Sequence, residues 1–234
     1  MVKDAPEGAQ YLVIADAIAA QIAADGPPST RLPSERALAE RFGCQRPTIR
    51  EALQYLEGRG LIYRKDRSGW YVSPPRLDYD LNLAVPLAEI ARLQDRELVT
   101  EVLEENPALQ PPCREPATRF LALRRRSLDG QTVLIERLYM PNEYGQELAG
   151  ADLTMSMSDL LRDELGVQIT YERLTLNPTG MDPGLARLFS ATAGTPVLEI
   201  ERVRFSGDRL VSVDVEYWRP AAVRVTMNTH WERV

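Results

Sequence analysis

The sequence predicts an α+β protein with a small N-terminal helical part and a larger part dominated by strands. Three observations support this prediction. Residues 31–73 are typical of two short helices and a hairpin, residues 98–229 contain seven short strand-like runs, and charge is unevenly divided. Residues 31–76 hold ten Lys and Arg against five Asp and Glu, a net +5; the whole chain carries −6, so the remainder carries −11. Such a local basic part favours phosphate binding that weakens steeply with salt.

The N-terminal part begins with a predicted helix over residues 11–24, where Ile14, Ile18 and Ile22 recur at helical spacing. A second helix begins at Ser34, a favourable N-cap, and ends at Gly43, because a residue without Cβ adopts the left-handed conformation cheaply. A third helix starts near residue 46. Pro47 is tolerated there because first-turn N–H groups have no intrahelical partner. One face of this third helix is apolar: Ile49, Ala52, Leu53 and Leu56.

The opposite face of the third helix carries two guanidinium groups one turn apart, from Arg46 and Arg50, beside Gln45 and Thr48. A helix that is buried on one side and basic on the other suits a DNA major groove. Residues 61–64 and 70–73 flank a basic turn and predict a hairpin able to lie on phosphates. Arginines along a helix are most often only a solvated face, but here the helix pair, the hairpin and the charge coincide.

Residues 31–73 resemble the winged helix-turn-helix of the GntR family of bacterial transcription factors. The matching residues are Leu32, Pro33, Ser34, Glu35, Arg36, Gly43, Arg46, Thr48, Ile49, Arg50, Ala52, Leu53, Gly60, Leu61 and Ile62. The resemblance implies DNA contacts from Ser34, Arg36, Gln45, Arg46, Pro47, Thr48, Arg50, Arg67, Ser68 and Gly69. Gln45 and Pro47 depart from the family pattern, which is expected to change operator preference rather than abolish binding. The implied partner is a double-stranded DNA operator read by a homodimer.

The later strand-like runs cover residues 98–103, 119–127, 133–140, 167–176, 197–205, 210–218 and 223–229. Asp129-Gly130 and Gly207-Asp208 predict hairpin turns, and helices are expected at residues 158–165 and 182–190. We therefore expect a DNA-binding domain over residues 1–75, a partly ordered linker over residues 76–96, and a mainly antiparallel domain over residues 97–234.

The second part resembles the UTRA domain, the effector-sensing module of the HutC branch of GntR regulators. The matches are residues 120–126, Asp129-Gly130, residues 133–136 and 139–141, Leu160-Leu161, Gly166-Val167, residues 194–198 and 200–202, and Trp218-Arg219. The resemblance implies a chorismate-lyase-like fold that binds a small molecule without turning it over.

An anion site is expected in this second part. Arg124 and Arg126 lie two apart on a predicted strand and so face the same side, with Arg125 opposite. Two guanidinium groups on an inner face require an anion, because they are costly to bury unpaired. Ser156 and Ser158 stand at the start of a predicted helix, whose first N–H groups also favour an anion. The ligand expected here carries a phosphate, phosphonate or carboxylate.

Positions on neighbouring strands extend the expected effector site. By resemblance, Glu136 accepts hydrogen bonds from the ligand and Trp218 closes over it, while Ser212 stands where sugar-phosphate sensors of the branch tend to have Glu. Asp214 and Glu216 place carboxylates on one strand face, so an anion site facing them suggests a zwitterion. Since residues 69–76 look like those of regulators of phosphonate use, the first candidate is 2-aminoethylphosphonate or a relative.

Two structural interpretations compete with this site. The two arginines could bond Glu136 and Glu201 across strands. Asp214 and Glu216 could be the wet face of a half-exposed strand, which the pattern alone slightly favours. Both interpretations stay open at the level of the sequence.

The sequence lacks the residues that several other classes of protein need. Cys44 and Cys113 are too few for a disulfide framework or a zinc site, and His230 is the only histidine, so no cofactor or metal is expected. No apolar run approaches membrane-spanning length and no signal-peptide core is present, so we expect a cytoplasmic protein with no membrane partner. The main hypothesis is a transcriptional regulator controlled by an anionic or zwitterionic metabolite. The resemblance to the HutC branch, whose members are commonly repressors, implies that it is a repressor. The alternatives are an enzyme of chorismate-lyase-like fold and a ligand-independent DNA-binding protein.

Overall fold

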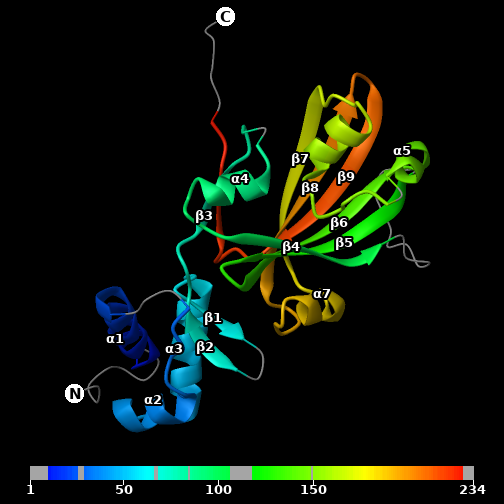
Figure 1. The fold of residues 1–234 in the computed structure, drawn as a ribbon. Helices are drawn as coiled ribbons and strands as arrows, with labels where there is room; N and C mark the ends of the chain where they lie inside the picture. The colour runs from blue at the N-terminus through cyan, green and yellow to red at the C-terminus, as the bar shows by residue number, and fades with distance from the viewer. Residues whose placement is uncertain are drawn as a thin grey trace, which may run out of the picture. The chain divides into compact units, whose positions relative to one another are not determined.

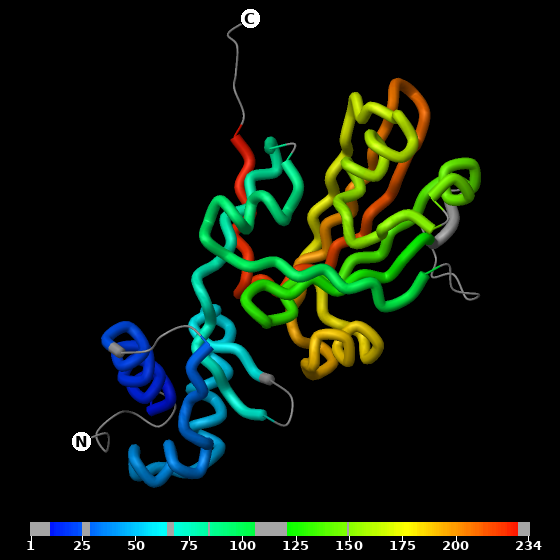
Figure 2. Tube along the Cα trace, viewed as in Figure 1, coloured from blue at the N-terminus to red at the C-terminus, as the bar shows by residue number. Residues whose placement is uncertain are grey.

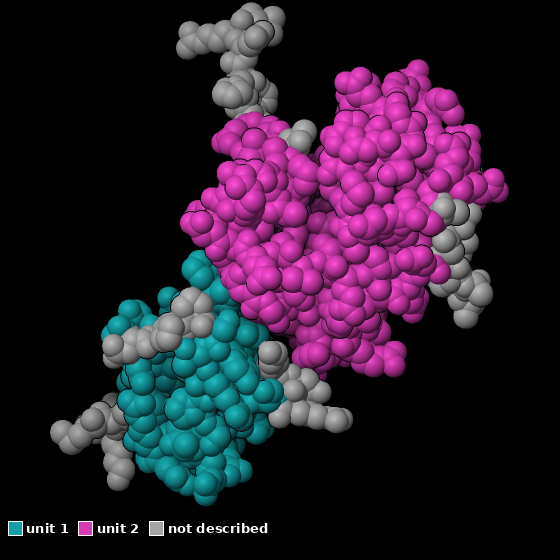
Figure 3. Space-filling model, viewed as in Figure 1, with its two compact units in different colours: residues 1–76, 220–222 teal, residues 77–219, 223–234 magenta. Residues whose placement is uncertain are grey.

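The computed structural model describes residues 10–25, 29–65, 68–83, 85–105, 118–148 and 150–228. Arg67, a predicted DNA-contacting residue, lies outside these ranges, and so do Cys113 and His230. The chain divides into two compact units: unit 1 comprises residues 1–76 and 220–222, and unit 2 comprises residues 77–219 and 223–234 (Figure 3). Within the described ranges, no helix is long and apolar enough to cross a membrane.

Unit 1 consists of three helices and a hairpin (Figure 1). The elements are α1 (Gln10–Asp25), α2 (Glu35–Phe42), α3 (Arg46–Gly58), β1 (Ile62–Lys65) and β2 (Gly69–Val72). The predicted caps are confirmed: the Ala37 N–H donates to Ser34 Oγ at 3.2 Å, and Gly43 ends α2 with φ at 63°. The apolar faces of the three helices meet in one core with the hairpin, formed by Ile14, Ala15, Ile18, Leu38, Ile49, Ala52, Leu53, Leu56, Ile62 and Trp70.

Unit 2 is built on a six-stranded antiparallel sheet in the order β4-β5-β6-β9-β8-β7. The strands are β4 (Leu98–Glu105), β5 (Thr118–Leu128), β6 (Gln131–Pro141), β7 (Tyr171–Gly180), β8 (Pro196–Ser206) and β9 (Arg209–Trp218). Asp129 and Gly130 both have positive φ, at 48° and 77°, and make the predicted turn between β5 and β6. The predicted α+β class with a mainly antiparallel sheet is therefore confirmed.

The two faces of this sheet differ in chemistry. One face is apolar and packs against α7 (Pro183–Leu188), with Leu123, Ile135, Val203 and Val213 in the same buried cluster as Leu185. The side chains that alternate with these point to the other face and include charged residues of β5, β6, β8 and β9. The charged face is partly covered by α6 (Met157–Asp159) and by the single π-helical turn η1 (Leu160–Glu164) that follows it.

Several elements differ from the sequence-based expectation. β7 begins at Tyr171 rather than at residue 167, and α5 (Asn142–Glu147) was not predicted. Residues 76–96, expected to form a linker, contain β3 (Leu77–Asp80) and α4 (Leu87–Arg92). The last predicted strand is shorter, β10 (Val223–Thr226), and pairs in parallel with β3 rather than with the main sheet (Figure 2).

Candidate functional site

The residues predicted to contact DNA lie on α2, α3 and the hairpin of unit 1. Arg46, Pro47 and Arg50 are exposed on α3, and Gln45 stands at its N-cap without a side-chain bond. The remaining members of the set are Ser34 at the N-cap of α2, exposed Arg36 on α2, half-buried Thr48 on α3, and Ser68 and Gly69 at the start of the second hairpin strand. Arg67 is outside the described residues.

Glu35 is a positioning residue that the sequence-based set omitted. Its carboxylate accepts a hydrogen bond from Arg50 Nη2 at 3.0 Å and one from Trp70 Nε1 at 3.5 Å, so it links α2, α3 and β2. Burial alone would raise the pKa of Glu35, but Arg50 and Trp70 lower it below its usual range. Glu35 therefore holds a predicted DNA-contacting arginine in place. The matched Leu-Pro-Ser-Glu-Arg motif contained the signal for this role.

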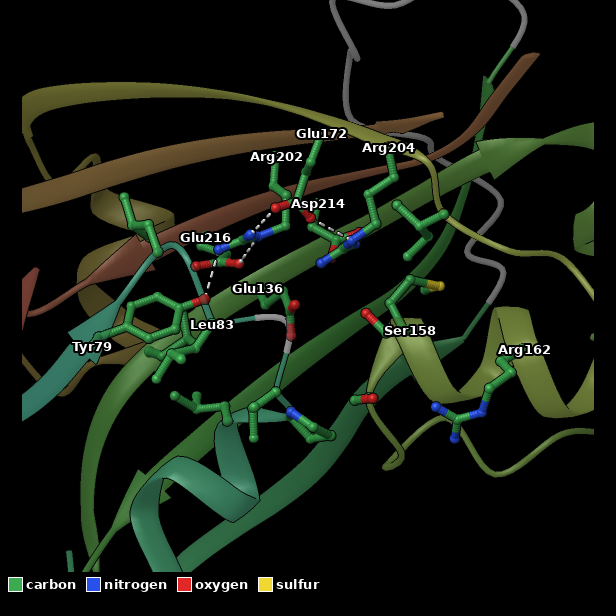
Figure 4. Close-up of a pocket in the computed structure, with 18 of the residues that line it drawn as sticks. Tyr79, Leu83, Glu136, Ser158, Arg162, Glu172, Arg202, Arg204, Asp214 and Glu216 are labelled. Carbon is green, nitrogen blue, oxygen red and sulfur yellow. Dashed lines mark hydrogen bonds and ion pairs between the residues drawn. The ribbon is translucent and has the colours of Figure 1, made fainter. Parts of the chain in front are cut away.

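Unit 2 contains a pocket of about 400 Å³ (Figure 4). Its floor is the charged face of the main sheet. One wall comes from residues 79–83 and 85–87, which form the end of β3 and the segment after it. The other wall comes from residues 156–172. Nine charged residues line it: Arg124, Arg126, Arg162, Arg202, Arg204, Glu136, Glu172, Asp214 and Glu216. This lining therefore offers charged and hydrogen-bonding groups to a molecule that enters the pocket.

Arg124 and Arg126 face the same side of β5, as predicted, and both contact Glu136 on β6. Arg124 Nε donates to Glu136 Oε2 at 2.9 Å, and Arg126 Nη2 lies 3.2 Å from the same oxygen. Arg124 is fully buried and also donates from Nη1 to the backbone carbonyls of Leu153 and Met155. Arg124 thereby ties the loop before α6 to the sheet, which makes it a positioning residue.

A second pair of arginines, Arg202 and Arg204 on β8, completes the charged floor. Arg202 donates to Glu216 Oε1 at 3.1 Å and to the Tyr79 hydroxyl at 2.6 Å, and it also bonds Glu172. Arg204 bonds Asp214 and donates to Glu172 Oε1 at 2.9 Å. This pair was not among the predicted site residues. Its spacing of two along a predicted strand is the same signal that identified the first pair.

The interpretation that Asp214 and Glu216 form the solvent-exposed face of a strand is wrong. Their exposed fractions are 1% and 4%, because the antiparallel register places them between β6 and β8 in the centre of the sheet. Glu136 pairs with Arg124 and Arg126 of β5, as the competing interpretation expected for that carboxylate. The register nevertheless gives Asp214 and Glu216 arginine partners of their own on β8.

The remaining predicted effector residues are placed as follows. Ser156 caps α6 by accepting from the Asp159 N–H at 3.1 Å, and it lines the pocket together with half-buried Ser158. Trp218 also lines the pocket but is buried, and its Nε1 donates to Glu216 Oε2 at 2.7 Å. Ser212 is fully buried and accepts from Arg204 at 3.2 Å, and it is not among the residues lining the pocket. The structure therefore places Ser212 beneath the pocket-lining Arg204 and not at the pocket surface, where a ligand contact was expected.

The buried carboxylates differ in their proton affinity. Burial alone would raise the pKa of Glu136, but Arg124 and Arg126 lower it to about 2. Burial raises the pKa of Asp214, and the nearby carboxylate of Glu136 adds to this, whereas Arg204 opposes it. Oxygens of Glu136, Asp214 and Glu216 lie within 4.8 Å of one another, a spacing that could hold a metal ion. The surrounding guanidinium groups already neutralise them, so an ion pair network is favoured over a metal site.

The stability of unit 2 should depend on pH through Glu136. Because its pKa in the folded protein, about 2, lies below the ordinary value of 4.5, ionised Glu136 contributes stability above about pH 4.5, and this contribution is lost as pH falls toward 2. Urea unfolding of the wild type and of Glu136→Gln from neutral pH to about pH 3 measures this effect. We expect the difference in unfolding free energy to shrink on acidification, and a constant difference would contradict the assignment.

Comparisons with known proteins agree with both units. Residues 10–72 match the family of bacterial regulatory proteins called gntR, and residues 108–224 match the UTRA domain. The chain is 30% identical over 210 residues to the uncharacterised HTH-type transcriptional regulator YihL of Escherichia coli K12, covering 86% of this chain and 89% of the relative. It is 29% identical over 187 residues to the HTH-type transcriptional repressor NagR of Bacillus subtilis, covering 76% of each.

The solved structures agree on the fold. PhnF from Mycobacterium smegmatis aligns with a TM-score of 0.62 at 21% identity, covering 94% of this chain and 100% of that chain. YihL and NagR are named as transcriptional regulators rather than as enzymes, and the UTRA architecture fits the HutC branch. This chain thus belongs to the GntR family of bacterial regulatory proteins, as a transcriptional regulator that carries a UTRA domain.

Proposed function

We propose that this regulator is a repressor that binds its operator as a homodimer and loses or gains operator affinity when a small anionic or zwitterionic metabolite binds unit 2. The observation that carries the proposal is the charged pocket, in a chain that also has an exposed, arginine-bearing α3. GntR regulators bind DNA operators and UTRA domains bind small-molecule effectors, and two relatives carry the name repressor, NagR of Bacillus subtilis and MngR of Escherichia coli. The first candidate effector remains 2-aminoethylphosphonate.

The chain connectivity supports coupling between the pocket and DNA binding. Residues 79–87 lie directly after the point where the chain passes from unit 1 to unit 2, and they include pocket-lining residues. Trp218 lies just before the chain returns to unit 1 at Pro220. A ligand that contacts these segments acts next to two of the three points where the chain passes between the units. The ligand changes the affinity of the dimer for its operator if it binds one arrangement of the dimer more tightly than another. We propose residues 1–75 as the DNA-binding domain, 76–96 as this connecting segment and 97–234 as the effector domain.

The proposal is tested first without effector. Selection from a random duplex library with the full-length protein should yield a two-fold symmetric site, bound more tightly than a scrambled duplex in moderate salt. The absence of any preference would overturn the proposal. A selected site whose affinity no metabolite changes would favour the alternative of a ligand-independent DNA-binding protein.

Arg126→Ala is expected to leave operator affinity unchanged and to abolish the response to effector. Arg126 lines the pocket and lies far along the chain from α3, so its loss removes an anion contact without touching the predicted DNA-binding residues. Operator affinity should be measured by fluorescence anisotropy with and without a saturating effector. Arg125→Ala is the matched control, since Arg125 pairs with Glu101 on the opposite face of β5. An unchanged effector response of the Arg126 variant would refute the anion site.

A further inference from the structure

The ionised groups on the pocket floor are balanced in number before any ligand binds. Four arginines face four carboxylates: Arg124, Arg126, Arg202 and Arg204 against Glu136, Glu172, Asp214 and Glu216. Arg162 also lines the pocket, but Asp159 and Asp163 pair with it at the surface. A ligand with a large net charge would leave one sign uncompensated in this buried environment, which is costly. The balance therefore favours a ligand whose own charges nearly cancel.

Three buried polar atoms on this floor have no hydrogen-bond partner among the described residues. Arg126 Nε is a buried donor and Asp214 Oδ1 is a buried acceptor, and both residues line the pocket. Arg124 Nη2 also lacks a well-directed hydrogen bond, but it lies 2.7 Å from Glu136 Oε2 and so has an ion-pair partner. By contrast, all three nitrogens of the Arg202 guanidinium group have partners.

A buried polar atom without a hydrogen bond has lost its water without compensation, so Arg126 Nε and Asp214 Oδ1 are where a ligand gains most. Arg126 Nε offers a hydrogen bond to an anion, and Asp214 Oδ1 accepts one from a cation. Both residues flank Glu136: Arg126 Nη2 is 3.2 Å from Glu136 Oε2, and oxygens of Asp214 and Glu136 lie within 4.8 Å. A small molecule with an acceptor at one end and a donor at the other can satisfy both atoms.

We infer that the pocket selects a small zwitterion, with its anionic group bound by Arg126 and its ammonium group bound by Asp214. This inference rests on the proposed function and deepens it, because it assigns separate roles to the charged residues. Arg126 binds the anion, Asp214 determines selectivity for an amine, and Arg124 positions the loop that carries Ser156 and Ser158 at the pocket wall. Because burial raises the pKa of Asp214, an ammonium group placed there compensates the carboxylate that burial disfavours.

The test compares probes that differ only in the amine. Full-length protein is titrated with ω-aminoalkylphosphonates and ω-amino acids of two to six carbons, and with the matched alkylphosphonates and alkanoates in which a methyl group replaces the amine. Thermal shift and calorimetry measure binding. We expect at least one amine-bearing probe to bind tenfold or more tightly than its isostere. Equal binding of the two members of every pair, or no binding by any probe, would overturn the inference.

Two variants assign the selectivity to one residue. Asp214→Asn should reduce the preference for the amine to near unity while anion binding persists. Glu101→Gln is the control, because Glu101 pairs with Arg125 on the opposite face of the sheet and does not line the pocket, and it should retain the preference. A retained preference in Asp214→Asn would contradict the assignment. The wild-type comparison needs no variant, so the inference stays testable even if a variant fails to fold.

The proposed function can fail independently of this inference. If amine-bearing probes bind selectively but never change operator affinity, the pocket assignment stands and the regulatory role is wrong. If a simple anion binds as tightly as its amine-bearing match and does change operator affinity, the regulatory role stands and the zwitterion assignment is wrong.

Discussion

Arg124→Ala is expected to lower the free energy of unfolding of unit 2 by about 3–5 kcal/mol, the usual cost of removing one partner of a buried ion pair. Arg124 is fully buried, and its loss leaves Glu136 inside the protein with only the longer contact to Arg126. The carbonyls of Leu153 and Met155 also lose their donor, so the loop before α6 is released from the sheet. Urea unfolding followed by tryptophan fluorescence measures the loss.

The matched control for this prediction is Arg125→Ala on the same strand. Arg125 pairs with Glu101 at 2.7 Å, but its side chain is 33% exposed, so its removal should cost only about 0.2–1 kcal/mol. A loss of under 1 kcal/mol in the Arg124 variant would show that Arg126 or water replaces the missing guanidinium group. That result would withdraw the positioning role assigned to Arg124.

Arg46→Ala should weaken binding to the selected operator by about 1–3 kcal/mol, roughly five- to 150-fold, if Arg46 contacts a base with two of its guanidinium nitrogens. Arg46 opens α3 at an exposed position, where a recognition helix presents its first residues to the major groove. The discriminating measurement is anisotropy on the operator and on a scrambled duplex at the same salt concentration.

The two duplexes separate base reading from phosphate binding. Loss on the operator alone assigns Arg46 to a base, whereas equal loss on both duplexes with a smaller salt slope reassigns it to a phosphate. Arg92→Ala is a charge-matched control, because Arg92 is exposed on α4 of unit 2 and pairs with Glu89 at 2.6 Å. It should change neither affinity. No loss on either duplex would remove Arg46 from the DNA-binding surface.

Local signals in the sequence predicted most elements correctly. The caps at Ser34 and Gly43, the turn at Asp129-Gly130 and the alternation of Arg124 and Arg126 each depend on residues close together in the chain. The structure confirms these predictions because caps, turns and alternation depend on local backbone conformation and strand periodicity. The same reasoning failed for α5, which follows β6 without an N-cap hydrogen bond from a side chain and so lacks the usual start signal.

The sequence by itself therefore determined the two-part organisation, the helix-turn-helix with its arginine-bearing face, and the placement of Arg124 and Arg126 on one face of a strand. Only the tertiary structure decided which charges meet. The strand order β4-β5-β6-β9-β8-β7 places β9 between β6 and β8, so it buries Asp214 and Glu216 and brings Arg202 and Arg204 to them. The physical reason is that periodicity defines the face of a single strand, whereas the partner across the sheet depends on the order and register of strands far apart in the chain.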